Sequence, residues 1–350
     1  MTASRVRETA PARVLVVRIG AMGDVLHALP AVAALRRLKP HWEIGWVVDR
    51  RWAALLESDE GAPVVDAVHR VPTRDWSARP VSVRTGRQIG ELRGELQSVD
   101  YDVCVDMQGT VRSGVIGRMA GAKEFAGYND PKEAPAGWMY DRRVERRGVH
   151  VVEQGCALLG EAIGVELAPG AVELPADAEA EAWCEDLLAG LGSFCLVAPT
   201  AGWGAKMWPA ERYAAVAREL ALAGYWVVVN AAGAKDAVAA AVARGSDGGG
   251  VAVASTVAQM VGLVRRSRLV IAGDTGPLHL GAALGRPVVG LFGPTDPARN
   301  GPWGSRARVL RHPSSATDHH RTGATEAGLL QIGVDEVVAA AMDLLEGPGE

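Results

Sequence analysis

This sequence contains no long apolar run and no paired cysteines. No segment approaches the roughly 18 apolar residues of a membrane span, so we expect any membrane association to be peripheral. Residues 1–12 carry Arg5 and Arg7 with no apolar signal core after them, and we expect a short disordered leader there. The four cysteines form no Cys-x-x-Cys pair, which is typical of reduced packing residues in a cytosolic protein. They are Cys104, Cys156, Cys184 and Cys195.

Several functional fingerprints are absent as well. The sequence has no Gly-x-Gly-x-x-Gly dinucleotide motif, no Gly-x-x-x-x-Gly-Lys-Ser/Thr phosphate loop and no Gly-x-Ser-x-Gly nucleophile turn. No His/Cys/Asp cluster has metal-ligand spacing, and we expect His319-His320 to lie in an irregular loop over residues 312–324. The formal net charge of −4 argues against a nucleic-acid partner. One segment is nevertheless locally basic, with Arg74, Arg79, Arg84 and Arg87.

Short apolar runs alternate with helical patterns along most of the 350 residues. Solid apolar strands that alternate with helices indicate an α/β fold with parallel sheets covered on both faces. The predicted strands are 14–18, 44–48, 103–106, 194–198, 226–230, 269–272 and 288–292. The predicted helices are 25–38, 86–96, 176–191, 209–223, 257–266 and 335–345.

The strand and helix pattern restarts after a stretch rich in proline, alanine and glutamate at residues 169–180. We therefore expect two domains, over residues 1–180 and 181–332, each an open parallel sheet. Such sheets bind ligands at the carboxyl ends of their strands, so we expect a site in a central cleft between the two halves. We expect the last segment, 333–350, to form a helix that could pack back on the first domain.

The first motif is a glycine turn between the first strand and the first helix, Ile19-Gly20-Ala21-Met22-Gly23-Asp24. Gly20 and Gly23 allow tight bends or close approach by a ligand. Asp24 fits two roles, either an ordinary capping residue of the helix or a general base that reaches an acceptor hydroxyl. His27 lies three residues further on, near the same face, and taken alone it reads as structural.

The second half contains a polar turn of another kind, Asp274-Thr275-Gly276-Pro277-Leu278-His279. It follows an apolar strand and begins an apolar helix, whose free backbone N–H groups and positive dipole end suit a phosphate. His279, one turn into the helix, could face that ligand. The alternative is a capped helix with a satisfied histidine, and this segment alone does not decide between the two.

Three further segments follow predicted strands. Thr200 and Lys206 lie between strand 194–198 and the next helix, where they could reach a diphosphate. Gln108 and Arg112 follow strand 103–106 and could contact a polar substrate on the first half. The turn at 293–297 is either a wall of the cleft or a simple tight turn.

Taken together, these segments resemble glycosyltransferase family 9, the ADP-heptose:lipopolysaccharide heptosyltransferases. The resemblance runs from residue 13 to about residue 312 and rests on four blocks in the family's order. The blocks are 22–30, 206–209, 274–279 and 293–297. Residues 132–143, with the block 106–109, look most like the heptosyltransferase I branch, which adds the first heptose to the Kdo of the inner core.

The resemblance implies a GT-B fold, in which two Rossmann-like doubly wound parallel-sheet domains face a central cleft. It also implies an inverting transfer from ADP-heptose that needs no metal and no other cofactor. Carried over by motif, Asp24 is the catalytic base and Lys206 neutralises the departing diphosphate. The donor-binding residues are then Thr200, Asp236, Asp274, Thr275, Gly276 and His279. The chain departs from the family here, because residues 233–238 are less acidic than the family's ribose-binding region. Either Asp236 serves from a shifted position, or the nucleotide is held differently.

The resemblance places the acceptor, a lipid-linked anionic saccharide, on the N-terminal domain. The residues expected to contact it are Arg18, Gly23, His27, Arg74, Gln108 and Arg112. It further implies a monomeric cytoplasmic enzyme in peripheral contact with the cytoplasmic face of the inner membrane. Two alternatives stay open: a family 9 transferase with another acceptor, such as a first heptose or a different glycan, and a non-catalytic nucleotide-sugar binding protein.

Overall fold

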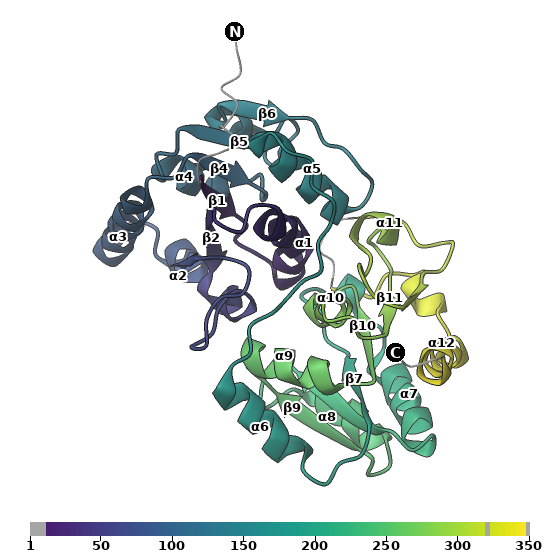
Figure 1. Ribbon diagram of the computed structural model, residues 1–350. Coiled ribbons are helices and arrows are strands. Elements are labelled where there is room, and N and C mark those ends of the chain that lie inside the picture. Colours follow the sequence, from purple (N-terminus) through teal and green to yellow (C-terminus); the bar gives the residue numbers. More distant parts are fainter. Residues whose placement is uncertain (1–11, 319–322, 348–350) are drawn as a thin grey trace. The chain divides into compact units, whose positions relative to one another are not determined.

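The computed structural model describes residues 12–318 and 323–347. Residues 1–11 of the expected leader and the pair His319-His320 lie outside this range. The chain divides into two compact units, Met1–Pro175 and Ala176–Glu350 (Figure 1). The division falls shortly before the boundary that the sequence predicts at residue 180.

A six-stranded parallel sheet forms the centre of the described part of the first unit, in the order β3-β2-β1-β4-β5-β6. Its strands are β1 (Arg13–Val17), β2 (Glu43–Asp49), β3 (Ala67–Val71), β4 (Val103–Asp106), β5 (Glu124–Tyr128) and β6 (Arg142–Val144). The helices are α1 (Met22–Leu38), α2 (Thr73–Ala78), α3 (Val83–Val99), α4 (Val111–Met119) and α5 (Val151–Ile163), with 3-10 turns η1 (Arg50–Leu55) and η2 (Ala134–Met139).

The central strand β1 is apolar on both faces because helices cover both sides of the sheet. Leu15 and Val17 are fully buried in a core that includes Leu96 of α3 and Ile116 of α4. Val14 and Val16, whose side chains point to the opposite face, are equally buried. Helix α5 contacts β4, β5 and α1. A strand without polar alternation is what a parallel sheet covered on both faces requires.

The second unit repeats this design with the sheet order β12-β11-β10-β7-β8-β9 within its described residues. Its strands are β7 (Phe194–Ala198), β8 (Trp226–Ala231), β9 (Gly250–Ala254), β10 (Leu269–Gly273), β11 (Val288–Leu291) and β12 (Ala307–Leu310). The helices are α6 (Ala178–Leu188), α7 (Ala210–Leu222), α8 (Ala237–Gly245), α9 (Val257–Arg266), α10 (Gly276–Ala283), α11 (Pro297–Asn300) and α12 (Val334–Glu346), with 3-10 turns η3 (Gly204–Lys206) and η4 (Leu329–Gln331).

Counted within each unit, both sheets place their strands in the order third, second, first, fourth, fifth, sixth. This is the order of doubly wound Rossmann-type sheets, whose chain reverses its direction of winding between the first and fourth strands. The reversal lies between β1 and β4 in one unit and between β7 and β10 in the other. The predicted α/β class with two parallel sheets is confirmed.

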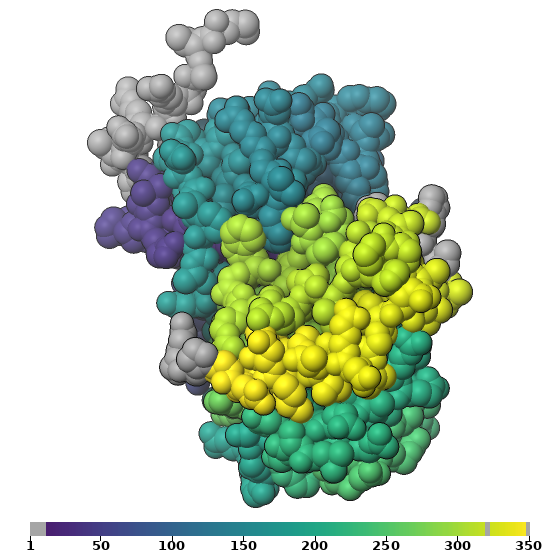
Figure 2. Space-filling model, turned by 90° about the vertical axis from the view of Figure 1, so that its right-hand side faces the viewer, coloured from purple at the N-terminus to yellow at the C-terminus, as the bar shows by residue number. Residues whose placement is uncertain are grey.

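Helix α12 packs on the second unit, which differs from the expectation that it could pack back on the first domain. It contacts α7, β10, β11 and β12. Its apolar face, with Val337, Ala341 and Leu344, joins the core of those elements. The indole of Trp208 anchors the preceding segment by donating to the carbonyl of Ile332 over 3.2 Å. Figure 2 shows the C-terminal segment, in yellow, spread over one face of the green and teal unit. An uncovered apolar face on α7 and this sheet is the physical reason for that placement.

Among the helices of the described ranges, none combines the length and the apolar content of a membrane span.

We predict that Gly45→Ala destabilises the first unit. A Cβ at Gly45 in β2 would lie 1.9 Å from the hydroxyl oxygen of Tyr101, which shares a 2.7 Å hydrogen bond with His69. Tyr101 is buried and has no room to move, so the clash should cost about 1–3 kcal/mol. Urea denaturation followed by circular dichroism measures this loss.

The control is Gly86→Ala, on α3, where an added Cβ meets no atom within 4 Å. That substitution should be neutral or stabilising by up to about 1 kcal/mol, because alanine is the better helix former. Equal unfolding midpoints for Gly45→Ala and the unaltered chain would contradict the packing described for Tyr101.

Candidate functional site

Polar side chains gather at the carboxyl end of each sheet, where the winding direction reverses. In the first unit the Gly20 turn follows β1 and Gln108 follows β4. In the second unit Lys206 follows β7, and Asp274 follows β10. Parallel strands end at one edge, and ligands of doubly wound sheets bind outside that edge at the point of reversal. The topology therefore assigns one candidate site to each unit.

Asp24 holds the turn that opens α1 and pairs with an arginine. Its Oδ2 accepts from the backbone N–H of Ala21 over 2.9 Å, which makes it the N3 member of a capping box. Its Oδ1 lies 2.8 Å from Nη2 of Arg18. The Asp24 side chain is 43% exposed, whereas that of Arg18 is 16% exposed. The carboxylate is thus both a helix cap and accessible to solvent, so the two roles left open by the sequence are compatible.

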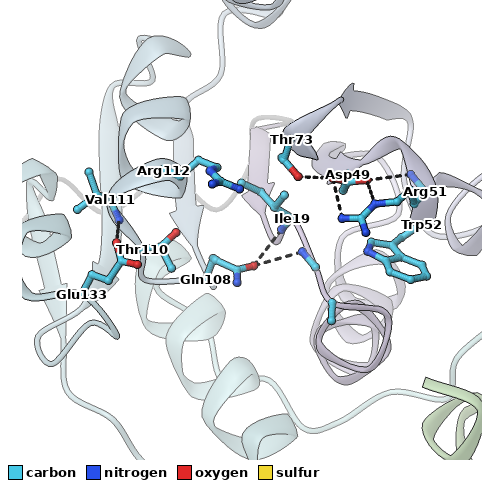
Figure 3. Close-up of a pocket in the computed structure, with 12 residues that line it drawn as sticks. Ile19, Asp49, Arg51, Trp52, Thr73, Gln108, Thr110, Val111, Arg112 and Glu133 are labelled. Atoms are coloured by element: carbon cyan, nitrogen blue, oxygen red, sulfur yellow. Dashed lines mark hydrogen bonds and ion pairs between the residues drawn. The ribbon is translucent and has the colours of Figure 1, made fainter. Parts of the chain in front are cut away.

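Gln108 ties the ends of β1 and β4 together. Its side-chain oxygen accepts from the backbone N–H groups of Ile19 and Gly20 over 3.1 and 3.3 Å (Figure 3). The loop that carries Gln108 is in turn held by Asp106, whose Oδ1 accepts from the N–H groups of Gln108 and Gly109. Gly20 has φ of +148°, and a Cβ there would lie 2.7 Å from Nε1 of Trp52. Glycine is therefore required for this close turn.

A pocket of about 540 Å³ opens beside this turn. Its walls come from the ends of β1, β2 and β4, from the starts of α2 and α4, and from the segment before η2. The lining residues are Ile19, Gly20, Ala21, Asp49, Arg51, Trp52, Thr73, Gln108, Thr110, Val111, Arg112 and Glu133 (Figure 3). The cavity contains two arginines, two carboxylates, two hydroxyls and an amide, and Arg51 is paired with Asp49. Together with Arg112, these hydrogen-bonding groups suit a polar ligand with several hydroxyls and an acidic group.

The sequence analysis missed the wall of this pocket that follows β2. Asp49 is 1% exposed and accepts from Nε and Nη2 of Arg51 over 2.7 and 3.1 Å, and from the hydroxyl of Thr73. Burial by itself raises the pKa of Asp49. The hydrogen bonds from Arg51 and Thr73 and the charge of Arg51 together lower it by more, so the net pKa lies below its ordinary value. The Arg51 guanidinium also lies over the ring of Trp52, with 5.3 Å to the centroid. The signal was available in the sequence, since Asp49 ends a buried strand and Arg51 follows it by two residues.

The opposite wall begins at the N-terminus of α4. Thr110 caps this helix through the N–H of Ser113, and Glu133 Oε2 accepts from the N–H of Val111 over 2.8 Å. A carboxylate therefore sits at the positive end of the helix. Arg112 donates from Nη2 to the Ser77 hydroxyl of α2 over 3.1 Å. The predicted residues Gln108 and Arg112 line the pocket together, and Glu133 was not predicted.

The remaining acceptor-side residues occupy different positions. Gly23 is in the first turn of α1 and half-buried, next to Asp24. His27 is 8% exposed and its ring packs edge-on against His150, with 5.4 Å between centroids. Arg74 is exposed on α2, beside the pocket residue Thr73. A role of these residues in acceptor binding stays a prediction.

In the second unit Asp274 joins a lysine and a histidine. Its Oδ2 lies 2.5 Å from Nζ of Lys206, and its Oδ1 lies 2.9 Å from Nε2 of His279. The Asp274 side chain is 8% exposed and that of Lys206 is 15% exposed. Burial raises the pKa of Asp274, but its hydrogen bonds and charge contacts with His279 and Lys206 lower it more, so the net pKa falls well below its usual range. The carboxylate is therefore ionised, and it holds Lys206 at the end of β10.

The start of α10 lies beside this pair. Thr275 is the N-cap residue by backbone geometry, its hydroxyl donates to the carbonyl of Gly273, and Gly276 and Pro277 form the first turn. Lys206 also lies 5.3 Å from the ring centroid of Trp203. A cation next to a helix N-terminus can bind a diphosphate through both the ammonium and the backbone N–H groups.

Two donor-side predictions have a local structural account. Thr200 lies two residues beyond β7, half-buried. Asp236 is the N-cap of α8: its Oδ1 accepts from the N–H groups of Val238 and Ala239, and its Oδ2 from that of Ala232. These bonds explain an aspartate at this position without a ligand, and its contact with a ribose stays a prediction. The expectation that the reaction needs no metal also stays a prediction.

Comparison with known proteins shows which protein family the chain matches. Residues 89–328 match glycosyltransferase family 9 (heptosyltransferase). Lipopolysaccharide heptosyltransferase 1 of Pseudomonas aeruginosa is 29% identical over 296 residues, which cover 83% of this chain and 81% of that protein. Lipopolysaccharide heptosyltransferase 1 of Escherichia coli K12 is 28% identical over 305 residues, which cover 86% of this chain and 94% of that protein.

Solved structures agree on the fold. The chain matches the E. coli heptosyltransferase WaaC with ADP at a TM-score of 0.79 and 24% identity, covering 95% of this chain and 99% of the other. It matches a family 9 glycosyl transferase from Veillonella parvula at a TM-score of 0.80 and 22% identity, covering 96% and 98%. The two Rossmann-like units are therefore those of a GT-B fold.

We predict that Asp274→Asn destabilises the second unit at neutral pH. The amide cannot neutralise the buried Lys206, and removal of one partner from a buried ion pair costs about 3–5 kcal/mol. The pKa of Asp274 is lower in the folded chain than in the unfolded one. Its stabilisation is thus complete above the unfolded pKa of about 3.9 and is lost as the pH falls through the folded value. Urea denaturation between pH 7 and pH 3 should show a shallower loss of stability in the variant.

Asp177→Asn is the matched control, because this N-cap residue of α6 accepts through Oδ1 from the N–H of Ala180 and asparagine caps a helix about as well as aspartate. It should change the stability at pH 7 by less than about 0.5 kcal/mol. A wild-type unfolding midpoint for Asp274→Asn, at either pH, would show that the pair with Lys206 is not stabilising.

Proposed function

Because the chain belongs to glycosyltransferase family 9 (heptosyltransferase), we propose that it moves a heptose from ADP-heptose to the Kdo of the lipopolysaccharide inner core, with inversion. The observation that carries this proposal is the division of charge between the units. The first has an accessible carboxylate, Asp24, beside a pocket that contains two arginines. The second has a buried lysine, Lys206, beside a helix N-terminus.

Asp24 is the general base in this proposal. An inverting transfer needs the acceptor hydroxyl to lose its proton as its oxygen attacks the anomeric carbon. Arg18, at 2.8 Å, orients the carboxylate and the bond from Ala21 fixes its other oxygen. Ala21 itself lines the pocket, so a saccharide bound there can bring a hydroxyl to Asp24.

Lys206 and the start of α10 stabilise the leaving ADP. Negative charge builds up on the diphosphate as the sugar–phosphate bond breaks, and a fixed cation with helix N–H groups lowers the energy of that state. Asp274 positions Lys206 without being a ligand of the diphosphate itself. His279, which binds the other oxygen of Asp274, keeps this carboxylate in place. Structures of the related E. coli heptosyltransferase WaaC with ADP and with ADP-2-deoxy-2-fluoro heptose support an ADP-linked donor.

The pocket of the first unit suits the acid sugar of the acceptor. A Kdo residue has a carboxylate and several hydroxyls. The guanidinium groups of Arg51 and Arg112 can bind the carboxylate. Thr73, Thr110 and Gln108 can form hydrogen bonds with the hydroxyls. The curated relatives are named for the first heptose transfer, which favours Kdo over a heptose as the acceptor. The protein would act as a monomer at the cytoplasmic face of the inner membrane.

The direct test is ADP release from ADP-heptose in the presence of a Kdo-bearing lipid, with a heptose-bearing lipid as the competing acceptor. Asp24→Asn should lower kcat by about 10²–10⁴-fold, because the amide cannot accept the proton. Its dissociation constant for ADP-heptose should stay within about twofold, because it acts on the acceptor.

Asp59→Asn, which changes an exposed carboxylate on the same unit, is the control and should keep full activity. A strong loss of donor affinity in Asp24→Asn would show that Asp24 stabilises the fold as a helix cap and would contradict its role as the general base. Tight donor binding with no ADP release by the unaltered chain would favour the non-catalytic alternative.

Lys206→Met should lower kcat by about 10²–10³-fold, the usual loss when one stabilising donor is removed from a transition state. Lys206→Arg retains the charge and should restore part of that rate. Rates from folded protein, verified by circular dichroism, measure both. Full activity of the methionine variant would remove Lys206 from the proposed mechanism.

A further inference from the structure

The loop between α2 and α3 presents two apolar side chains to solvent. Val81 is 98% exposed and Val83, the first residue of α3, is 91% exposed. Ser82 between them caps the helix through the N–H of Thr85, so the loop has a defined conformation. Most large apolar side chains in this unit are buried, and two almost fully exposed valines, separated by one residue on an ordered turn, call for an explanation.

The same loop is strongly basic. Residues 74–87 carry four arginines and a single acidic residue, Asp75, which pairs with Arg50. Arg79, Arg84 and Arg87 are exposed beside the valines. The chain as a whole has a net charge of −4, so this segment stands apart from it. The exposed arginines complement an anionic surface, and the two valines complement an apolar layer beneath that surface.

Two further exposed apolar side chains lie on elements that are connected to α2 and α3 through α4. Trp138 of η2 is 80% exposed, and Val115 of α4 is 48% exposed. Helix α4 contacts η2 and α3. The bond from Arg112 to Ser77 further links α4 to α2. Tryptophan is enriched at membrane–water interfaces, where its ring contacts an apolar region and its N–H contacts water.

This surface shares an edge with the pocket. Helices α2 and α4 and turn η2 follow β3, β4 and β5, so they leave the parallel sheet at its carboxyl edge. Val111 and Arg112 of α4 line the pocket, and Thr73 of α2 does too. A ligand held in that pocket would therefore contact the starts of α2 and α4, the elements that lead into this surface.

We propose that this surface, formed by the loop 79–84 with Trp138 and the exposed side of α4, docks the first unit onto an anionic lipid bilayer. This docking proposal rests on the proposed function in one respect, that the acceptor is linked to a lipid. Val81 and Val83 enter the interface, and the arginines bind lipid phosphates. Each basic residue near an anionic membrane strengthens binding about fivefold.

A protein partner explains the surface less well. Stable protein interfaces bury about 800 Å² on each side and have an apolar centre with a polar rim. Here the apolar side chains project singly from a turn, with arginines among them. Such a shape suits a surface that deforms around it, which a bilayer does.

The experiment is sedimentation of the full chain with vesicles, without donor or acceptor. Vesicles of phosphatidylcholine with phosphatidylglycerol should bind the chain, and vesicles of phosphatidylcholine alone should bind it at least tenfold more weakly. The double variant Val81→Asp, Val83→Asp should weaken binding to the anionic vesicles at least tenfold. Arg79→Gln with Arg84→Gln should weaken it by about 25-fold, two steps of the fivefold effect.

The controls change exposed residues of the second unit. Leu222, on α7, is 75% exposed, and Leu222→Asp should bind vesicles as the unaltered chain does. Arg218→Gln with Arg308→Gln alters the net charge by the same amount and should have less than twofold effect. Transfer to a lipid-free Kdo acceptor should be unchanged in both loop variants, so a failure of docking and a failure of the proposed reaction give different results.

Three outcomes would overturn the proposal. One is equal sedimentation of the loop variants and the unaltered chain; another is no preference for anionic vesicles. The third is self-association, seen by light scattering, that the valine double variant abolishes, which would assign the surface to a second copy of the chain. If the aspartate variant does not fold, the arginine variant alone decides.

Discussion

The buried carboxylate of Asp274 is the interaction on which the second unit's site depends. It joins the loop after β7, through Lys206, to the end of β10, 68 residues further along the chain, and it also bonds His279 of α10. A lysine so little exposed would be costly without that partner, since an unpaired buried ammonium loses its hydration. With it, a cation stands at a helix N-terminus before any ligand arrives. Preorganisation of this kind is what makes electrostatic stabilisation of a leaving group effective.

The first unit uses buried carboxylates in the same place but for a different purpose. Asp106 ends β4 and accepts from Ser113 and Tyr140 as well as from the loop backbone, and it has no cation among those partners. Burial therefore dominates and raises the pKa of Asp106, whereas charged neighbours lower that of Asp274. Asp49 lies between these cases, with Arg51 as its ion-pair partner. In each case an aspartate at the carboxyl end of a buried strand shapes the polar loop that follows. The loops differ in charge, and the ligands that we assign to them differ in chemistry: an acid sugar in the first unit and a diphosphate in the second.

The sequence predicted the central strands well and the edge strands poorly. The residues of β4 and β7 were predicted without error, because both are solid apolar runs that are buried on both faces. Five strands of the described residues were not predicted: the edge strands β3, β6, β9 and β12, and the interior strand β5. Strand β9 is mostly glycine and alanine, and β12 is partly exposed. The wall formed by Asp49, Arg51 and Trp52 was not predicted, although β2 was. The loop after β2 has no glycine turn of the kind that marks the ends of β1 and β10. The placement of α12 depends on an uncovered face of the sheet, which periodicity alone does not reveal.

The central claim is that the turn after β10, with Lys206, holds the diphosphate of the donor. A crystal structure of the full chain with ADP-heptose tests it most directly. The account predicts phosphate oxygens within hydrogen-bond distance of Nζ of Lys206 and of the backbone N–H of Gly276, with Asp274 still bound to His279. A diphosphate bound elsewhere, with the pair of Lys206 and Asp274 untouched by the ligand, would contradict it.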